Sequence, residues 1–178
     1  NNLKANGELT ESAGRAIWVP PNDAARLEYD VEINHQRDAG GYDALITDTF
    51  ALFRGDNLVP AAKVSSIAGA VSSTTLQVVL PQSWTSVETG WPRRAKTTFV
   101  IDNPERRFDR PTGWMLAGKL GIRRNTLDGT DFVVAAPKDS EMRRMDILSF
   151  ATLLWPQVST AFAVQLEKVL VVGAGEPI

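Results

Sequence analysis

The sequence predicts a mainly β protein, with an antiparallel β-sandwich followed by a strand–helix–strand unit. Short runs rich in β-branched and aromatic residues recur about every ten to fifteen residues as far as residue 128, with turn residues between them. Helical periodicity appears only after residue 139, and an apolar run at 164–172 follows it. We therefore expect a sandwich domain with a junction strand at 1–128 and the opening elements of a second, truncated domain at 129–178.

The polarity of the sequence and the positions of its prolines predict the elements of the N-terminal region. Residues 1–14 are polar and predict a loop or a loose edge, whereas RAIWV at 15–19 predicts a short strand. That strand should end at Pro20 and Pro21, because proline cannot donate to a strand ladder. Charged and apolar residues then alternate over 26–33, which is typical of an amphipathic antiparallel strand.

Further sandwich strands are predicted from apolar runs separated by turn chemistry. ALITDTFALFRG at 44–55 predicts one or two strands, and the run at 75–80 predicts a strand that ends before Pro81. SWTSVETGWPRR at 83–94 predicts a loop or short hairpin, and AKTTFVID at 95–102 predicts another strand. Single strands at 115–123 and 131–136, joined by the turn NTLDGT, complete the set.

The pattern changes at Asp139 and Ser140, which offer an N-cap, while Glu141 suits the positive end of a helix. The apolar residues that follow recur at three to four positions and predict a buried stripe: Met142, Met145, Leu148, Ala151 and Trp155. Pro156 should end or kink this helix, because it lacks an amide donor. The apolar run VQLEKVLVV at 164–172 predicts the final strand.

Composition excludes several classes of protein. The 178 residues are 43% hydrophobic, which allows a sizeable core, and 19 basic against 21 acidic residues argue against a nucleic-acid partner. No apolar run approaches the roughly 18 residues of a membrane span. Cysteine is absent, which excludes disulfides and thiolate chemistry. The first residue is not Met, which indicates removal of a signal peptide or of other flanking sequence, and the last residues follow an apolar run abruptly. We therefore expect a piece of a longer protein, and the location we expect for it is periplasmic or secreted.

Few residues are candidates for catalysis or metal binding. His35 is the single histidine and so the only candidate base of a catalytic triad, although a solvated loop histidine is the simpler interpretation. A catalytic zinc site normally needs two or three histidines. The acidic residues, such as Glu105 and Asp109, have arginine neighbours and predict local ion pairs. The sequence therefore predicts no catalytic residue and no metal ligand.

Five tryptophans raise the question of a ligand platform, because aromatic faces stack on sugars and peptides. Trp84 and Trp91 lie beside Arg93 and Arg94 and are the candidates for such a platform. Packing at the end of the sandwich is the alternative for both. The platform would make this a non-catalytic module that binds peptide or carbohydrate, and a structural or assembly protein of the cell envelope is a third possibility.

FDRPTGWMLAGKLGIRR at 108–124 combines glycines with many cationic residues. A phosphate-binding loop would need glycines that lead directly into a helix N-terminus. Here Gly113, Gly118 and Gly121 lead into a predicted strand, where glycine more often marks a bulge or a close backbone approach. We therefore interpret the segment as the strand that joins the two domains, with Trp114 packed between them.

The segments FVIDNPERRFDRPTGWMLAGKLGIR, SEMRRMDILSF and KVLVVGAGEP resemble the N-terminal part of glycyl-aminopeptidase-like zinc metallopeptidases, which are gluzincins. The resemblance covers residues 25–178. It implies an all-β N-terminal domain ahead of a thermolysin-like α/β catalytic domain, which opens with strand, helix and strand. It also implies that Gly173, Ala174 and Glu176 match the edge-strand motif by which related aminopeptidases hold the amino terminus of the substrate. A plain turn after a buried strand is the alternative.

The family's zinc-binding motif HExxH does not occur in these residues. In the family this motif supplies two zinc ligands and the general base. The resemblance therefore implies a non-catalytic N-terminal scaffold that supports domain packing and substrate approach. Its expected partners are its own downstream catalytic domain and a peptide substrate, and zinc is the expected cofactor of the full-length protein.

Overall fold

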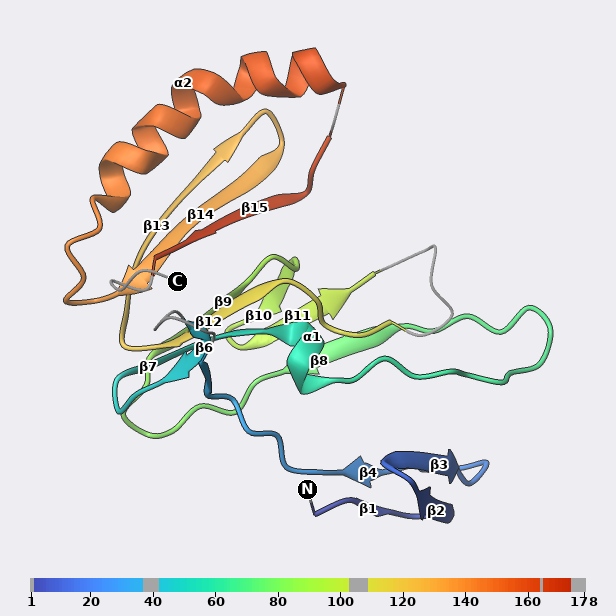
Figure 1. Ribbon diagram of the computed structural model, residues 1–178. Coiled ribbons are helices and arrows are strands. Elements are labelled where there is room, and N and C mark those ends of the chain that lie inside the picture. Colours follow the sequence, from blue (N-terminus) through green and yellow to red (C-terminus); the bar gives the residue numbers. More distant parts are fainter. Residues whose placement is uncertain (1, 37–41, 103–108, 164, 174–178) are drawn as a thin grey trace. The chain divides into compact units, whose positions relative to one another are not determined.

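The computed structural model describes residues 2–36, 42–102, 109–163 and 165–173 (Figure 1). It contains two compact units, Asn1–Glu32 and Ile33–Ile178, and each is described by itself. The chain is mainly β with one long helix late in the sequence, which confirms the predicted fold class. The domain boundary predicted at residue 128 stays a prediction.

The first unit is built from short antiparallel pairs. β2 (Glu8–Ser12) pairs with β3 (Arg15–Val19), and β1 (Lys4–Ala5) pairs with β4 (Leu27–Glu28). Ala13 and Gly14 link β2 to β3 with φ angles of 48° and 74°, the left-handed geometry of a tight hairpin turn. Residues 1–14, expected to form a loop or a loose edge, contain the short strands β1 and β2, because a polar sequence can form strands when a turn brings two together.

The strand predicted at 26–33 is also shorter than expected. Only Leu27–Glu28 forms strand, and residues 29–34 have no regular secondary structure. Its partner β1 has two residues, so the ladder stops after two pairs. Alternating polarity predicted the strand, but a strand needs a neighbour of matching length to satisfy its backbone.

The second unit contains a β-sandwich of two antiparallel sheets. One has the order β5-β6-β7-β12-β9, and the other has the order β10-β11-β8. The strands of the first sheet are β5 (His35–Gln36), β6 (Tyr42–Ile46), β7 (Phe50–Arg54), β12 (Trp114–Gly118) and β9 (Ser86–Thr89). Those of the second are β10 (Arg93–Ala95), β11 (Thr98–Ile101) and β8 (Thr74–Gln77), and a short helix α1 (Gly55–Leu58) follows β7.

A third sheet has the order β13-β14-β15, with strands Leu120–Leu127, Thr130–Pro137 and Lys168–Val172. β13 and β14 form a hairpin, whereas β14 and β15 are parallel and are connected through α2 (Arg144–Phe162). The predicted strand–helix–strand unit is confirmed. The single strand predicted at 115–123 was wrong, because Lys119 separates β12 from β13 and these two strands belong to different sheets.

The third sheet is covered on both faces. Phe132 and Val134 of β14 pack with Leu148 of α2, while Val133 and Ala135 pack on the opposite face with residues of the five-stranded sheet. Figure 1 shows α2 on one side of β13, β14 and β15. A central strand that is covered on both faces needs apolar residues at consecutive positions, which explains the run FVVAA.

The core of the sandwich lies on the other face of the five-stranded sheet. Phe53, Met115 and Ala117 face this core, which Phe99 of β11 and half-buried Leu76 of β8 complete. Successive residues of β12 therefore face two different cores, with Leu116 toward the third sheet and Met115 and Ala117 toward the sandwich. The five-stranded sheet is the middle layer of the unit.

The helix differs from its prediction at both ends. It begins at Arg144 rather than after Ser140, whose hydroxyl instead accepts a bond from the Met142 amide at 3.2 Å. It also continues through Pro156 to Phe162. One missing amide donor is tolerated because the helix packs on the sheet through the stripe that contains Leu148 and Trp155. Met145 is 52% exposed, so its prediction as a buried stripe residue was wrong.

Candidate functional site

The edge strand β15 is the element on which the predicted substrate site lies. It pairs with β14 on one side, and among the described residues no strand pairs with its other side. All five residues of β15 are half-buried. The amide of Gly173 donates to the Ala135 carbonyl at 3.0 Å, so the ladder continues one residue beyond the strand. An edge of this kind can accept an extended peptide as an additional strand.

Gly173 directly follows β15 and lies against the side chain of Met142. A Cβ at this position would lie 2.4 Å from Sδ of Met142, in the segment that leads into α2. Ala174 and Glu176 lie outside the described residues. The prediction that Gly173, Ala174 and Glu176 bind the substrate's amino terminus therefore stays a prediction.

An ion cluster lies at the start of the same strand. Lys168, the first residue of β15, has a side chain only 6% exposed. Its Nζ donates to the Trp91 carbonyl at 3.1 Å and lies 3.8 Å from Oε2 of Glu88. Burial lowers the pKa of the Lys168 ammonium, and Glu88 opposes this by favouring the charged form.

Glu88 is the centre of this cluster. Its side chain is fully buried, and its Oε1 contacts Nη2 of Arg93 at 2.7 Å and Nη2 of Arg124. Its Oε2 has no hydrogen-bond partner within the described part of the chain. The cluster joins β9, β10, β13 and β15, so it fixes the start of β15 against the sandwich. We describe it below as the Glu88 cluster, which comprises Glu88, Arg93, Arg124 and Lys168.

Sequence reasoning missed the Glu88 cluster. The segment 83–94 was predicted as a loop or hairpin, and its glutamate appeared to be one of many surface carboxylates. The four residues come together only when four strands pair and pack. A charged residue between the β-branched residues Val87 and Thr89 in a strand was the one available signal.

The glycine-rich segment does not form an anion site in the described residues. Nη1 of Arg110 donates to the carbonyls of Asp56 at 3.2 Å and Val59 at 2.7 Å. The Gly113 amide donates to the Asp56 carboxylate at 3.0 Å. Burial raises the pKa of Asp56, but the Gly113 amide, Arg54 and Arg110 outweigh it and lower the pKa below its usual value. The arginine and glycine therefore serve to hold α1 against β12.

Trp114 lies where the five-stranded sheet meets the third sheet. It is half-buried and packs with the cluster that contains Leu116 and Val133, and the Arg54 guanidinium lies 5.8 Å from its ring centre. Gly118, at the other end of β12, has a φ of 144°, and a Cβ there would lie 2.3 Å from the Thr49 carbonyl oxygen. The glycine therefore allows the close backbone approach that the sequence predicted.

The remaining sequence candidates are placed on the sandwich. His35 is exposed, and its Nδ1 lies 3.1 Å from Oδ2 of Asp43 on the adjacent strand. Trp84 and Trp91 are half-buried against the sandwich core. Their indole nitrogens donate to the carbonyls of Asp48 at 3.1 Å and Thr112 at 3.3 Å. Both tryptophans therefore match the packing interpretation rather than an exposed platform.

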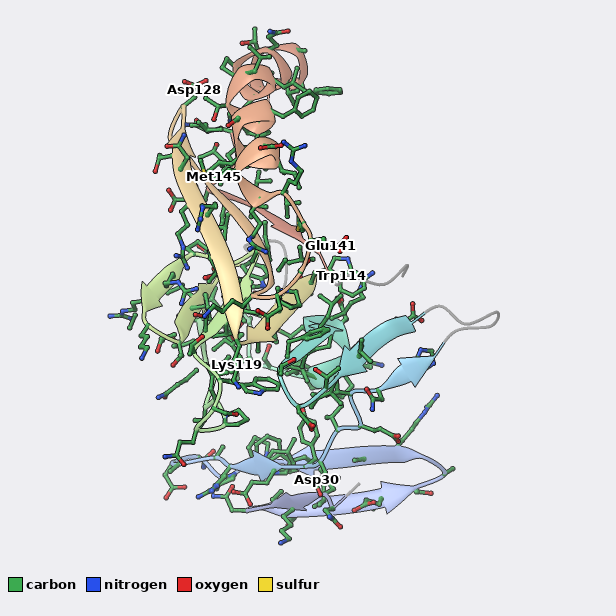
Figure 2. All side chains as sticks on the ribbon, turned by 90° about the vertical axis from the view of Figure 1, so that its left-hand side faces the viewer. Asp30, Trp114, Lys119, Asp128, Glu141 and Met145 are labelled. Atoms are coloured by element: carbon green, nitrogen blue, oxygen red, sulfur yellow. The ribbon has the colours of Figure 1, made fainter. Side chains whose placement is uncertain are left out.

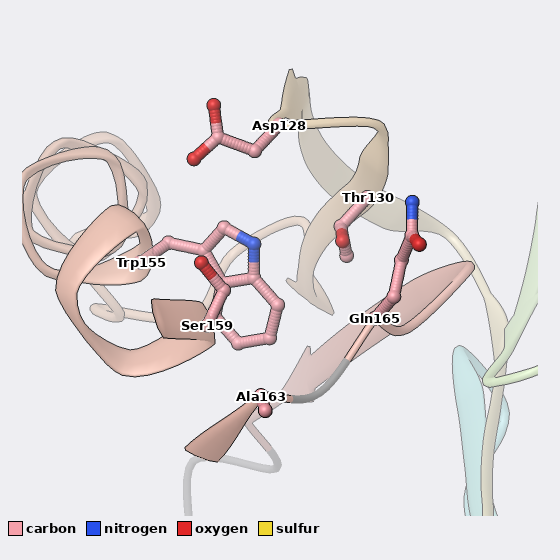
Figure 3. Close-up of a pocket in the computed structure, with 6 residues that line it drawn as sticks. All are labelled: Asp128, Thr130, Trp155, Ser159, Ala163 and Gln165. Carbon is pink, nitrogen blue, oxygen red and sulfur yellow. The ribbon is translucent and has the colours of Figure 1, made fainter. Parts of the chain in front are cut away.

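A hollow of about 300 Å³ lies at the far end of the third sheet (Figure 3). Figure 2 shows Asp128 at the tip of the β13–β14 hairpin, away from Lys119 at the start of β13. The hollow is lined by Asp128, Thr130, Trp155, Ser159, Ala163 and Gln165. The indole nitrogen of Trp155 is buried and lacks a partner among the described side chains and backbone. Because the indole nitrogen is covered by neighbouring atoms, a molecule in the hollow could not form a hydrogen bond with it.

Neither a metal site nor a membrane span is found in what the structure describes. The described residues contain no group of three or more His, Asp or Glu side chains arranged to hold a metal ion. No helix within the described ranges is long and apolar enough to cross a membrane.

The chain has a β-rich fold that is also found in a known structure. The chain is similar to an aminopeptidase N family protein from Idiomarina loihiensis, with a TM-score of 0.62 and 15% sequence identity. The similarity covers 94% of this chain and 29% of that protein, so the chain spans less than a third of its length. No family model and no curated protein matches the chain. At this identity the similarity shows the fold alone.

Proposed function

We propose that residues 1–178 form the non-catalytic N-terminal scaffold of a bacterial zinc metallopeptidase of the aminopeptidase type, a gluzincin. The observation that carries this proposal is the similarity of fold, over 94% of the chain, to an aminopeptidase N family protein. The order of elements supports it, because a sandwich precedes a parallel strand–helix–strand unit. The protein would be periplasmic or secreted.

In this proposal the scaffold supports substrate approach through β15. The edge of this strand is unpaired in the described part of the chain, so a peptide backbone can pair there. Glu176 would bind the free ammonium of the substrate, since a carboxylate forms a charge-assisted hydrogen bond with it. The Glu88 cluster holds the other end of β15 in place.

Zinc would be held by residues beyond residue 178. The polypeptide extended with the sequence that follows this residue should hydrolyse amino-terminal aminoacyl anilides. A chelator should abolish the activity and zinc should restore it, whereas the 178-residue chain should be inactive. An extended sequence without HExxH, or activity that survives chelation, would contradict the proposal.

The role of Glu176 is tested in the same extended polypeptide. Glu176→Gln should raise KM for a peptide with a free amino terminus by at least tenfold, because the ammonium loses its ionic partner. Glu167→Gln, on an exposed residue before β15, is the matched control and should leave KM unchanged. Equal KM values for both variants would remove Glu176 from the substrate site.

A further inference from the structure

Asn6 connects the two strand pairs of the first unit. It lies between β1 and β2, and its backbone amide donates to the Arg26 carbonyl at 3.0 Å. Its side-chain Oδ1 accepts from the Arg26 amide at 2.6 Å, and its Nδ2 donates to the Ala24 carbonyl at 2.5 Å. The indole nitrogen of Trp18, on β3, donates to the Asn6 carbonyl at 2.6 Å. Asn6 therefore holds β1, β3 and the segment before β4 together.

Gly7, the next residue, is required by the backbone. Its φ is 84°, and a Cβ there would lie 2.3 Å from the carbonyl oxygen of Val19. The fold thus uses glycine at position 7 for its conformation and asparagine at position 6 for its hydrogen bonds. Asn6–Gly7 is the only Asn-Gly pair in the sequence. Both residues are exposed, so water reaches them.

An Asn-Gly pair is chemically reactive, because glycine has no side chain to hinder attack by its own backbone nitrogen. A bond forms between the Gly7 nitrogen and Cγ of Asn6, and the bond from Cγ to Nδ2 breaks. Nδ2 leaves as ammonia with the proton of the Gly7 amide. Water then adds to either carbonyl of the succinimide ring and opens it to aspartate or isoaspartate. The net reaction consumes water, releases ammonia and transfers no electrons.

We propose that Asn6 is a deamidation site that the folded first unit protects and that reacts when this unit opens. In the folded unit Oδ1 and Nδ2 are both hydrogen-bonded, and turning Cγ toward the Gly7 nitrogen would break both bonds. The unit contains only two-stranded sheets in its described part, and such sheets are marginally stable in water. Local opening therefore controls the rate of the reaction.

The product of the reaction should prevent the unit from closing again. An ionised aspartate accepts hydrogen bonds but donates none, so it would place an oxygen against the Ala24 carbonyl where Nδ2 now donates. Isoaspartate also adds a methylene group to the main chain at a bend that already lies against Val19. Deamidation thus makes a reversible opening permanent. The partners of Asn6 all lie in the first unit, so the change should be confined to it.

The protection is tested by incubating the 178-residue chain at neutral pH, in buffer and in urea that unfolds it, and following Asn6 by peptide mass spectrometry. Asn6 should deamidate at least tenfold more slowly in buffer than in urea. Trp18→Phe leaves Asn6 and Gly7 in place but removes the bond to the Asn6 carbonyl, so it should speed the reaction in buffer by about fivefold. Ile17→Val, on an exposed residue of the same strand, is the matched control and should leave the rate unchanged.

Equal rates in buffer and urea would overturn the inference, and so would an Asn6 that stays intact in urea. A rate for Trp18→Phe equal to that of Ile17→Val would show that the bonds to Asn6 do not control the reaction, which also overturns it.

The effect of the product is tested with Asn6→Asp. Hydrogen exchange of the amides at 4–28 should be at least tenfold faster than in the parent chain, while exchange in β12 and β14 should be unchanged. Unchanged exchange at 4–28 would overturn the proposal that deamidation keeps the unit open. Neither test involves zinc or peptide hydrolysis, so each outcome is independent of the proposed function.

Discussion

At the scale of the residue, Glu88 is the most consequential side chain of the second unit. A fully buried carboxylate is destabilising unless cations compensate for its lost hydration, and here Arg93, Arg124 and Lys168 do so. Arg93 and Lys168 also lie 4.6 and 5.5 Å from the ring centre of Phe99. The cluster thus links charge compensation to the packing of the sandwich core.

Glu88→Gln should lower the free energy of unfolding by about 3 kcal/mol, because it leaves the buried Lys168 ammonium without its anion. Urea denaturation followed by tryptophan fluorescence measures this loss. Glu141→Gln, on an exposed residue before α2, is the control and should change stability by less than about 0.5 kcal/mol. Equal stability of the two variants would show that the cluster contributes nothing to folding.

Trp155 and Trp84 differ in whether the indole nitrogen is hydrogen-bonded, and substitution of each residue tests what that bond contributes to stability. The Trp155 ring meets Phe132 edge-on at 4.8 Å, but its indole nitrogen is buried without a partner in the described structure. Trp84 donates to the Asp48 carbonyl. Trp84→Phe should therefore be more destabilising than Trp155→Phe by about 1 kcal/mol, since only Trp84 loses a hydrogen bond. Thermal and urea unfolding of both variants measure the difference, and the reverse order would contradict it.

At the scale of the element, the position of β15 depends on the segment that leads into α2. Met142 occupies the space beside Gly173, so the strand end and the helix entry must fit together. The sequence indicated glycine at this point as part of a substrate motif. In the structure Gly173 also packs against Met142, and this contact is compatible with a role in substrate binding.

Gly173→Ala should lower the free energy of unfolding by no more than about 1 kcal/mol, because the new methyl group displaces only Sδ of Met142, near the end of a flexible side chain. Adding Met142→Ala should recover part of this loss, which a double-mutant cycle measures. Gly90→Ala is the control, since no atom lies within 4 Å of a Cβ at that position. An additive cycle would show that Gly173 and Met142 are not in steric contact.

Prediction from sequence succeeded for elements whose pattern is local. The strand at 15–19, the long helix and the apolar strands that flank it were all expected. It failed where the outcome depends on a distant partner. The strand at 26–33 lacks a long neighbour, and the helix start moved from Ser140 to Arg144 because Ser140 forms a local turn instead.

At the scale of the whole molecule, the layers of the second unit explain which predictions were possible. The fold class followed from strand spacing and from the change of period after residue 139. The position of the five-stranded sheet as the middle layer could not be predicted in this way, because it requires β7 to pair with β12, about sixty residues later in the chain. The Glu88 cluster and the packing of Trp114 depend on the same long-range arrangement.

The junction at Lys119 has a consequence for how this chain tolerates changes in length. β12 and β13 lie in different sheets with one residue between them, and Gly118 presses against Thr49. One inserted or deleted residue here would invert the pleat of one sheet relative to the other and turn core residues outward. The segment 59–73, which has no helix or strand, can absorb such changes. Homologous sequences should therefore differ in length at 59–73 while keeping an ungapped alignment across 114–127.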